Sequence, residues 1–204
     1  ITDYYDYKGN DSSNGSCSRS VTIPSTISGK TVLKIGNYSF EEKNITSVTI
    51  PKTVTEIGYS AFESNKLTTV TIPSSVTTIK GSAFGYNKIT SLTLNEGLVT
   101  IGSSAFTENA IKTLKTPSTL VSIEYGAFYK NKITSLTLNE GLISIEGEAF
   151  YNNSITSVKA PNTLVRIGTS AFEENNIPSL TLNSGLKTIR DFAFFRNKIP
   201  SVTI

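Results

Sequence analysis

The sequence predicts a mostly β solenoid, a single stack of equal coils. Two observations predict it. First, the unit from Ile133 to Ser154 is one of seven copies of equal length, each starting 22 positions after the last, and an eighth copy opens at Ile199. Second, certain positions in the unit never change. A fixed period of roughly 20 to 50 residues is typical of solenoids, because one unit cannot bury its own apolar face and must stack on the next.

The unvarying positions report what each coil needs from its neighbours. The thirteenth residue of every unit is isoleucine, and the seventeenth and eighteenth are always Ala-Phe. The twenty-first is always asparagine, and these seven asparagines are Asn65, Asn87, Asn109, Asn131, Asn153, Asn175 and Asn197.

The first six residues of each unit are predicted to form a strand. In the copy that starts at Ile133, Leu136 and Leu138 alternate with Ser135 and Thr137, which is the pattern of a half-buried strand. Strands stacked one coil apart form a parallel sheet. A proline or an asparagine then ends the strand.

The second half of the unit carries apolar residues at Leu142, Ile145, Ala149 and Phe150. Glycine and β-branched residues in this half make a full helix unfavourable. We therefore expect a short extended piece through Ile145, followed by a 3₁₀-like turn at the Ala-Phe pair.

The asparagines are predicted to point inward as a ladder. The amide has two donors and two acceptor lone pairs, so stacked copies can bond the turn backbone of their own and neighbouring coils. Seven surface asparagines are the alternative, but surface positions in this chain vary freely.

The pattern Phe-x-x-Asn-x-Ile-x-x-Leu-x-Leu resembles a leucine-rich repeat. With Ile-Pro, Val-x-x-Ile-Gly and Ala-Phe added, it is similar to the BspA-like leucine-rich repeats of bacterial and protist surface proteins. The resemblance covers about residues 21–204. That family often has cysteine where these asparagines stand, and its unit is often one residue longer. The resemblance implies a right-handed solenoid.

The chain divides into a cap and a solenoid. Residues 1–20 are polar, depart from the period and are predicted to be an N-terminal cap, because a first coil lacks one neighbour. The alternative is that this segment is a calcium-binding loop with Asp3, Asp6 and Asp11 as ligands. The spacing of these aspartates lacks the D-x-D-x-D-G order of an EF-hand. The solenoid spans residues 21–204: a degenerate first coil at 21–44, seven regular coils at 45–198 and a partial coil at 199–204.

Two further features lie within the solenoid. The first coil has five extra residues in a turn at 25–31, a candidate contact loop or a feature of first coils. From Leu67 onward, units whose strand ends in proline alternate with units whose strand ends in asparagine, which gives a longer period of two units.

Composition excludes several classes of function. The net charge of +3 arises from 19 basic and 16 acidic residues that are scattered along the sequence, so we expect no nucleic acid partner. No apolar run is long enough to span a bilayer, so we expect no membrane insertion. The sequence has no initiator Met, no signal peptide and an end inside a repeat, so we expect a piece of a longer protein.

The sequence offers no chemistry that we can recognise. With no histidine there is no Ser-His or Cys-His pair, and Cys17 has no C-x-x-C partner for a metal. We therefore predict no catalytic residues, no metal site, no cofactor and no enzymatic activity.

The candidate binding surface is the outward face of the predicted strands. It is rich in hydroxyls and carries three lysines, and the candidate residues are Lys112, Lys115, Lys159, Thr49, Thr71, Thr93, Thr137 and Thr181. These residues could equally be β-formers that only keep the face soluble. Threonine ladders also occur in ice-binding solenoids, but the mixed Ser and Lys content argues against that use.

Aromatic residues offer two other surfaces. Phe192 and Phe195 replace small, polar or tyrosine residues in the last full unit, so they either contact further coils or form a patch for a partner. Tyr59, Tyr86, Tyr125, Tyr129 and Tyr151 fall on the turns and are not expected to gather in one patch.

The family resemblance implies a function that the repeats alone do not. It implies a non-enzymatic adhesion or protein-binding module, a monomer, of an extracellular or cell-surface bacterial protein. Its partner would be a host or neighbouring-cell protein or glycan. The alternative is a structural stalk that displays another domain and binds nothing itself.

Overall fold

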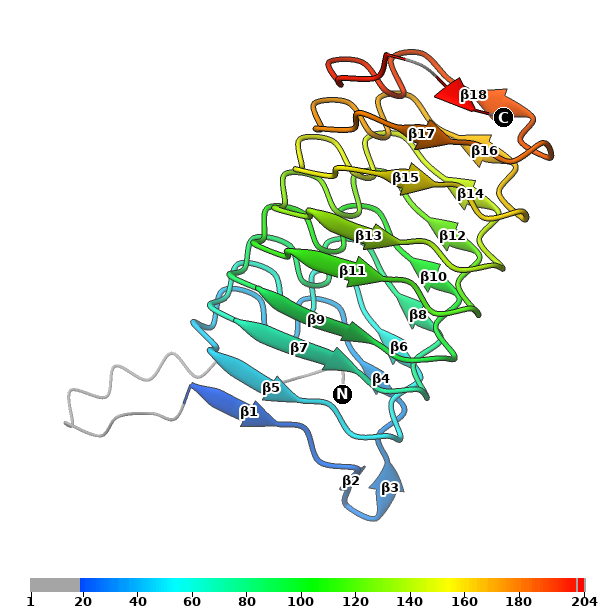
Figure 1. Ribbon diagram of the computed structural model, residues 1–204. Coiled ribbons are helices and arrows are strands. Elements are labelled where there is room, and N and C mark those ends of the chain that lie inside the picture. Colours follow the sequence, from blue (N-terminus) through cyan, green and yellow to red (C-terminus); the bar gives the residue numbers. More distant parts are fainter. Residues whose placement is uncertain (1–18, 201, 204) are drawn as a thin grey trace.

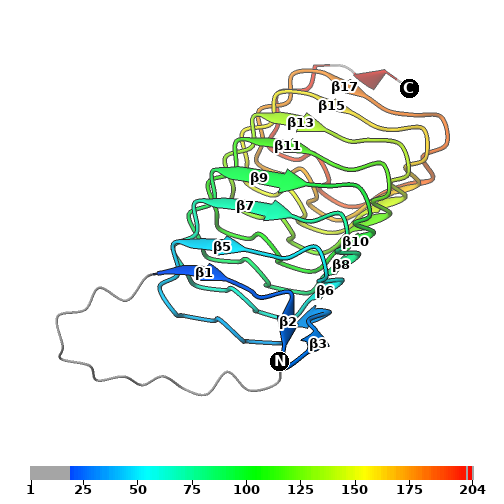
Figure 2. The same cartoon turned by 90° about the horizontal axis from the view of Figure 1, so that it is seen from below.

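The computed structural model describes residues 19–200 and 202–203, so the cap predicted at 1–20 lies almost entirely outside the described residues. The chain forms one stack of coils with a strand on each of two sides (Figure 1). No helix occurs among the described residues. Figure 2 shows the two sets of strands on different sides of the coils.

One set of strands, here called the front strands, uses the first residues of each repeat. Their bounds are β1 Ser20–Thr22, β5 Ser47–Thr49, β7 Thr69–Ile72, β9 Ser91–Leu94, β11 Thr113–Lys115, β13 Ser135–Thr137, β15 Val158–Lys159, β17 Leu180–Thr181 and β19 Val202–Thr203. All pair in parallel.

The other set, the back strands, contains the extended piece predicted in the second half of each unit. Each is two residues long: β4 Lys34–Ile35, β6 Glu56–Ile57, β8 Thr78–Ile79, β10 Thr100–Ile101, β12 Ser122–Ile123, β14 Ser144–Ile145, β16 Arg166–Ile167 and β18 Thr188–Ile189. They form one uninterrupted eight-stranded parallel sheet in which each repeat isoleucine pairs with the next, as Ile101 does with Ile123.

The five extra residues of the first coil fold as a small antiparallel hairpin. Its strands are β2 Thr26–Ile27 and β3 Lys30–Thr31. Ser28 and Gly29 between them have φ values of 49° and 76°, which is the left-handed backbone that a two-residue hairpin turn requires.

The turn at the Ala-Phe pair has the expected i to i+3 bonds but is not a continuous 3₁₀ helix. Ala61 N–H donates to Gly58 O at 3.3 Å, and Glu63 N–H donates to Ser60 O at 3.2 Å. Ser60 and Ser64, at the sixteenth and twentieth positions, are left-handed, with φ of 49° and 56°. Both positions are left-handed in every coil from the first to the seventh regular one.

This backbone shape lets alternate peptide groups bond to the next coil. Ser60 N–H donates to Gly81 O, Phe62 N–H to Ala83 O and Ser64 N–H to Gly85 O, at 2.8–3.0 Å. A left-handed residue other than glycine costs about 1–2 kcal/mol. The bonds between coils hold it in place.

The repeat phenylalanines stack through the middle of the solenoid. Phe40, Phe62, Phe84, Phe106, Phe128, Phe150, Phe172 and Phe194 form one column in which neighbouring ring centroids lie 5.1–5.5 Å apart. The six from Phe62 to Phe172 are fully buried. Each ring therefore contributes apolar surface to two coils, and offset stacking adds to that burial.

The repeat asparagines join adjacent coils by hydrogen bonds. Asn109 Nδ2 donates to Phe84 O in the preceding coil at 2.9 Å and to Phe106 O and Thr107 O in its own coil. Asn109 Oδ1 accepts from Ile89 N–H at 2.9 Å. All seven asparagines make the bond to the preceding phenylalanine carbonyl, at 2.7–2.9 Å.

We expect Phe106→Ala to destabilise the protein by about 3–5 kcal/mol, because it removes a fully buried ring between two others. Phe194→Ala should cost clearly less, because this ring is only half-buried and has a ring neighbour on one side. Urea denaturation of both variants measures the difference, and equal losses would contradict a shared core.

We expect Asn109→Asp to destabilise the protein by about 3 kcal/mol at pH 7, since a carboxylate cannot donate to the three carbonyls that Asn109 serves. Burial should raise the pKa of the new carboxyl above its unfolded value. The loss should therefore be complete above the folded pKa and should shrink as the pH falls towards the unfolded pKa of about 4.

Asn176→Asp is the matched control for this variant. Asn176 directly follows the ladder residue Asn175, but it lies on the exposed surface. Its urea midpoint should be nearly unchanged at pH 7 and pH 4. A pH-independent loss in the Asn109 variant would argue against the donor role of the amide.

Candidate functional site

The outward residues of the front strands form an exposed, hydroxyl-rich face. The structure places Thr49, Thr71, Thr93, Thr137 and Thr181 on this face, and all five are exposed. Because the strands pair in register, Thr71 lies beside Thr93 and Lys115 lies beside Thr137. Hydroxyl-bearing side chains continue along the whole face, but the hydrogen-bonded pairing of the strands beneath them is interrupted.

The front strands separate into four small sheets, unlike the uninterrupted back sheet. The groups are β1-β5, β7-β9, β11-β13 and β15-β17-β19. The three separations therefore lie between β5 and β7, between β9 and β11, and between β13 and β15. Each separation precedes a strand that ends at a proline, namely Pro73, Pro117 and Pro161.

Proline and asparagine at the strand end explain much of this grouping. Proline has no N–H to donate to the preceding coil. In the alternate coils, asparagine supplies that donor: Asn95 Nδ2 donates to Ile72 O at 3.0 Å and Asn139 Nδ2 donates to Thr116 O. Pro51 also follows a front strand, β5, yet β5 pairs with β1. A proline alone is therefore not sufficient to open the sheet.

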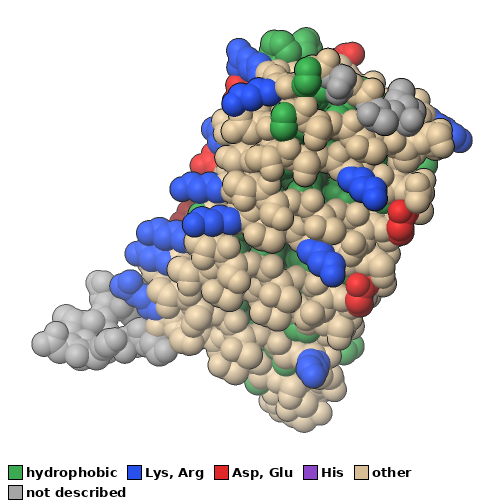
Figure 3. Space-filling model, in the orientation of Figure 1, with side chains coloured by type: hydrophobic (Ala, Val, Ile, Leu, Met, Phe, Trp, Pro, Cys, Tyr) green, Lys and Arg blue, Asp and Glu red, His purple; other side chains and the backbone are tan. Residues whose placement is uncertain are grey.

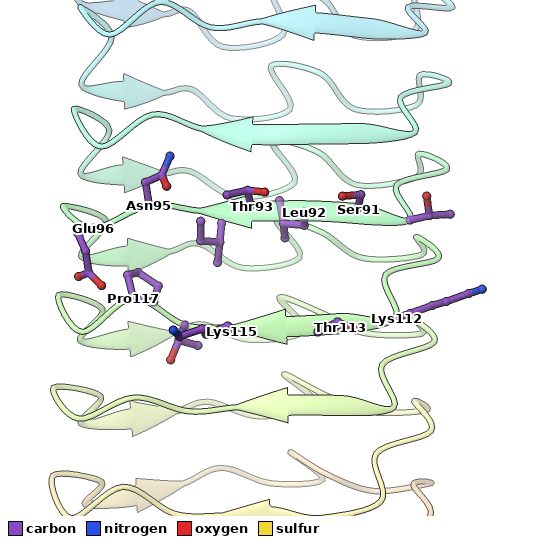
Figure 4. Close-up of a pocket in the computed structure, with 12 residues that line it drawn as sticks. Ser91, Leu92, Thr93, Asn95, Glu96, Lys112, Thr113, Lys115 and Pro117 are labelled. Carbon is purple, nitrogen blue, oxygen red and sulfur yellow. The ribbon is translucent and has the colours of Figure 1, made fainter.

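A groove of about 480 Å³ lies where β9 and β11 separate (Figure 4). The lining includes the inward residues Leu92 and Leu94 of β9, which are only half-buried. The corresponding residues Val70 and Ile72 of β7 are buried, because β7 is covered by its pairing with β9. The separation thus uncovers apolar surface on a face that is otherwise polar.

One end of the groove carries a pair of opposite charges. The Glu96 carboxylate accepts from Ser118 N–H at 3.2 Å and from Ser118 Oγ at 2.9 Å. The Ser118 backbone hydrogen bond is the main reason that the pKa of Glu96 is lowered, and Lys115 contributes by its positive charge. Figure 4 shows Lys115 over the groove near Pro117.

The three predicted lysines do not lie together. Lys112 is at the other end of the groove, and its side chain projects away from the groove beyond the start of β11 (Figure 4). Lys159 lies on β15, where the same arrangement returns two coils later. There the Glu140 carboxylate accepts from Asn162 N–H at 3.1 Å and from Asn162 Nδ2 at 3.2 Å.

The tyrosines on the turns gather more than we expected. Tyr86, Tyr125 and Tyr129 line one cavity of about 260 Å³. The Tyr129 and Tyr151 rings stack with centroids 5.2 Å apart. A hydrogen bond to Glu148 raises the pKa of Tyr125 to about 12. The expectation of scattered tyrosines was wrong for these four. Tyr129 and Tyr151 occupy the nineteenth position of adjacent coils, so their rings lie side by side.

Phe192 and Phe195 lie together on the last full coil. Their rings meet edge to face with centroids 5.6 Å apart, and 62% of Phe192 and 50% of Phe195 are exposed. The Arg196 guanidinium lies 5.5 Å from the centre of the Phe195 ring. These contacts form an exposed apolar patch.

Glu146 and Glu148 are close in sequence, and both carboxylates have structural partners. Glu146 forms an ion pair with Arg166, and Glu148 accepts from Tyr125. Within residues 19–200 and 202–203, no group of three or more His, Cys, Asp or Glu side chains is placed to hold a metal ion. The same part of the chain has no helix long and apolar enough to cross a membrane.

Comparisons with known structures support the fold. The pneumococcal vaccine antigen PcpA matches with a TM-score of 0.61 and 22% identity, over 81% of this chain and 40% of that one. A leucine-rich repeat protein from Bacteroides ovatus matches with a TM-score of 0.58 and 22% identity, over 82% of this chain and 52% of that one. A leucine rich cell surface protein from Faecalibacterium prausnitzii matches with a TM-score of 0.55 and 21% identity, over 91% of this chain and 65% of that one.

These identities show a shared fold, and the matches span about 40–65% of the length of these proteins. No curated protein sequence is similar enough to this chain to match it. The model of the BspA type leucine rich repeat region matches six copies, over residues 13–133 and 121–204. That match covers nearly the whole chain, which therefore belongs to the BspA-type leucine-rich repeat family.

Proposed function

We propose that this chain is a non-enzymatic protein-binding module of a bacterial surface or secreted protein. It binds its partner, a protein of a host or a neighbouring cell, with the front face. The partner lies across the groove between β9 and β11. No cofactor takes part, and the module acts as a monomer.

The observation that carries this proposal is the groove itself. It is the place where half-buried Leu92 and Leu94 meet the charged side chains of Lys115 and Glu96. An apolar centre with a polar rim is the usual composition of a protein-binding site. Its rigid back sheet keeps the cost of ordering on binding low.

The family and the named structures support the proposed location and role. Two of the similar structures are described as a vaccine antigen and as a cell surface protein. Leucine-rich repeats commonly serve as binding surfaces, because solenoids present long continuous faces. A partner with an extended, partly acidic segment fits the groove, since it could lie along β9 and meet Lys115.

The stalk is the second candidate function. The uninterrupted back sheet and the asparagine ladder favour it, because they would suit a rigid spacer as well as a binding scaffold. It does not account for the separation of the front strands, which a spacer would not need.

We expect the double substitution Lys115→Ala and Lys159→Ala to weaken partner binding by about tenfold or more, which is about 1.4 kcal/mol. Leu92→Ser should have an effect of similar size because it removes apolar surface at the groove centre. Partners are first identified on an array of secreted and cell-surface proteins and glycans, and affinities are then measured by surface plasmon resonance.

Lys52→Ala combined with Lys187→Ala is the matched control, because these lysines are also exposed and lie away from the groove. The control should bind as the wild type does. Unchanged binding in the Lys115/Lys159 variant would rule out the groove, and a wild-type chain that binds nothing on the array would favour the stalk.

A further inference from the structure

At five successive junctions, where the turn of one coil passes into the front strand of the next, one lysine is present. These residues, here called the basic edge, are Lys43, Lys66, Lys88, Lys112 and Lys132. Lys66, Lys88 and Lys132 directly follow ladder asparagines, so their backbone is fixed. Their N–H groups donate to Ile45 O, Leu67 O and Ile111 O at 2.8–3.1 Å.

The basic edge is linear. Stacked coils lie about 4.8 Å apart, so five lysines span about 19 Å along the solenoid. Figure 3 shows Lys and Arg side chains gathered along the left edge, where the front strands of Figure 1 begin. Lys112 borders the groove, but its side chain projects away from the groove and towards this edge (Figure 4).

Five basic residues on the turns and back strands are neutralised by carboxylates, but those of the edge are not. Across neighbouring coils, Lys34 and Lys80 pair with Glu56, Lys130 with Glu108, Arg166 with Glu146 and Arg196 with Glu174. None of the basic-edge lysines forms an ion pair with another described residue; Lys43, at one end, lies near Glu41. Lysines stacked this closely repel one another, so the edge gains from an anionic ligand.

We propose that the basic edge binds a linear acidic polysaccharide that carries carboxylate or sulfate groups on successive sugar rings. A single file of cations matches one thin chain of anions that runs along the solenoid. Each lysine is a point charge with three donors on a flexible stem, so it can follow anions whose spacing differs somewhat from that of the coils.

The same geometry disfavours nucleic acid. Proteins that bind single strands stack the bases on aromatic side chains, but the residues beside these lysines are aliphatic or threonine, such as Ile45, Leu67, Thr68 and Thr90. A duplex needs positive charge spread over a broad surface. One column of lysines does not provide it.

Apart from Lys112, which borders both, the edge is separate from the groove proposed for the protein partner. The groove uses Leu92, Leu94 and Lys115, and the edge uses the lysines at the start of the front strands. Binding at one surface can therefore be removed while the other is kept.

The test is the combined substitution Lys66→Gln, Lys88→Gln and Lys132→Gln, with a labelled heparin oligosaccharide as the probe. The wild type should bind it with an affinity that falls steeply as salt rises. The variant should bind about tenfold or more weakly at low salt. The slope of log affinity against log salt should fall by about three, one for each cation removed.

The matched control is Lys30→Gln, Lys52→Gln and Lys187→Gln, which removes the same charge from exposed lysines away from the edge. It should keep wild-type affinity and slope, and circular dichroism should show both variants folded. An equal loss of affinity in the control would show that only the net charge of the protein matters, and this would overturn the proposal. Wild-type binding of a short DNA duplex as tight as that of heparin, or no heparin binding, would also overturn it.

Discussion

The equal length of the coils is the constraint on which the rest of the structure depends, and the asparagine ladder enforces it. Each Asn Nδ2 reaches the phenylalanine carbonyl of the preceding coil at 2.7–2.9 Å. One inserted residue between Phe106 and Asn109 would move the amide out of reach and leave buried carbonyls unpaired. The extra residues of the first coil avoid this cost because they leave the stack as the β2-β3 hairpin.

The fold was largely predictable from the sequence because its core contacts repeat with the period of the chain. Alternation predicted β13, and the isoleucine of each unit marked the back strands. The left-handed residues were not predictable. Ser60, Tyr86 and Glu108 carry no glycine signature, and their backbone shape is held by hydrogen bonds to the next coil. A local sequence pattern contains no information about such bonds.

The candidate site was predictable only in part. The exposed positions of Lys115 and Lys159 follow from alternation along a strand. The groove does not, because it arises where two neighbouring strands fail to pair. The alternation of proline and asparagine at strand ends was the available signal, since only one of the two residues can donate to the preceding coil. The basic edge was not predicted, for a different reason. Its lysines are about one repeat apart in the sequence and so look scattered, but the solenoid places them next to one another.

Pairs of coils, rather than single coils, therefore set the surface. The core repeats with every coil, but the Pro-type and Asn-type coils make the front face repeat with every second coil. Lys115 and Lys159 then lie two coils apart along the same face. A ligand that reaches both engages the second at high effective concentration once the first is bound. A solenoid can in this way convert contacts that are weak one at a time into useful affinity, because its rigid interior fixes their spacing.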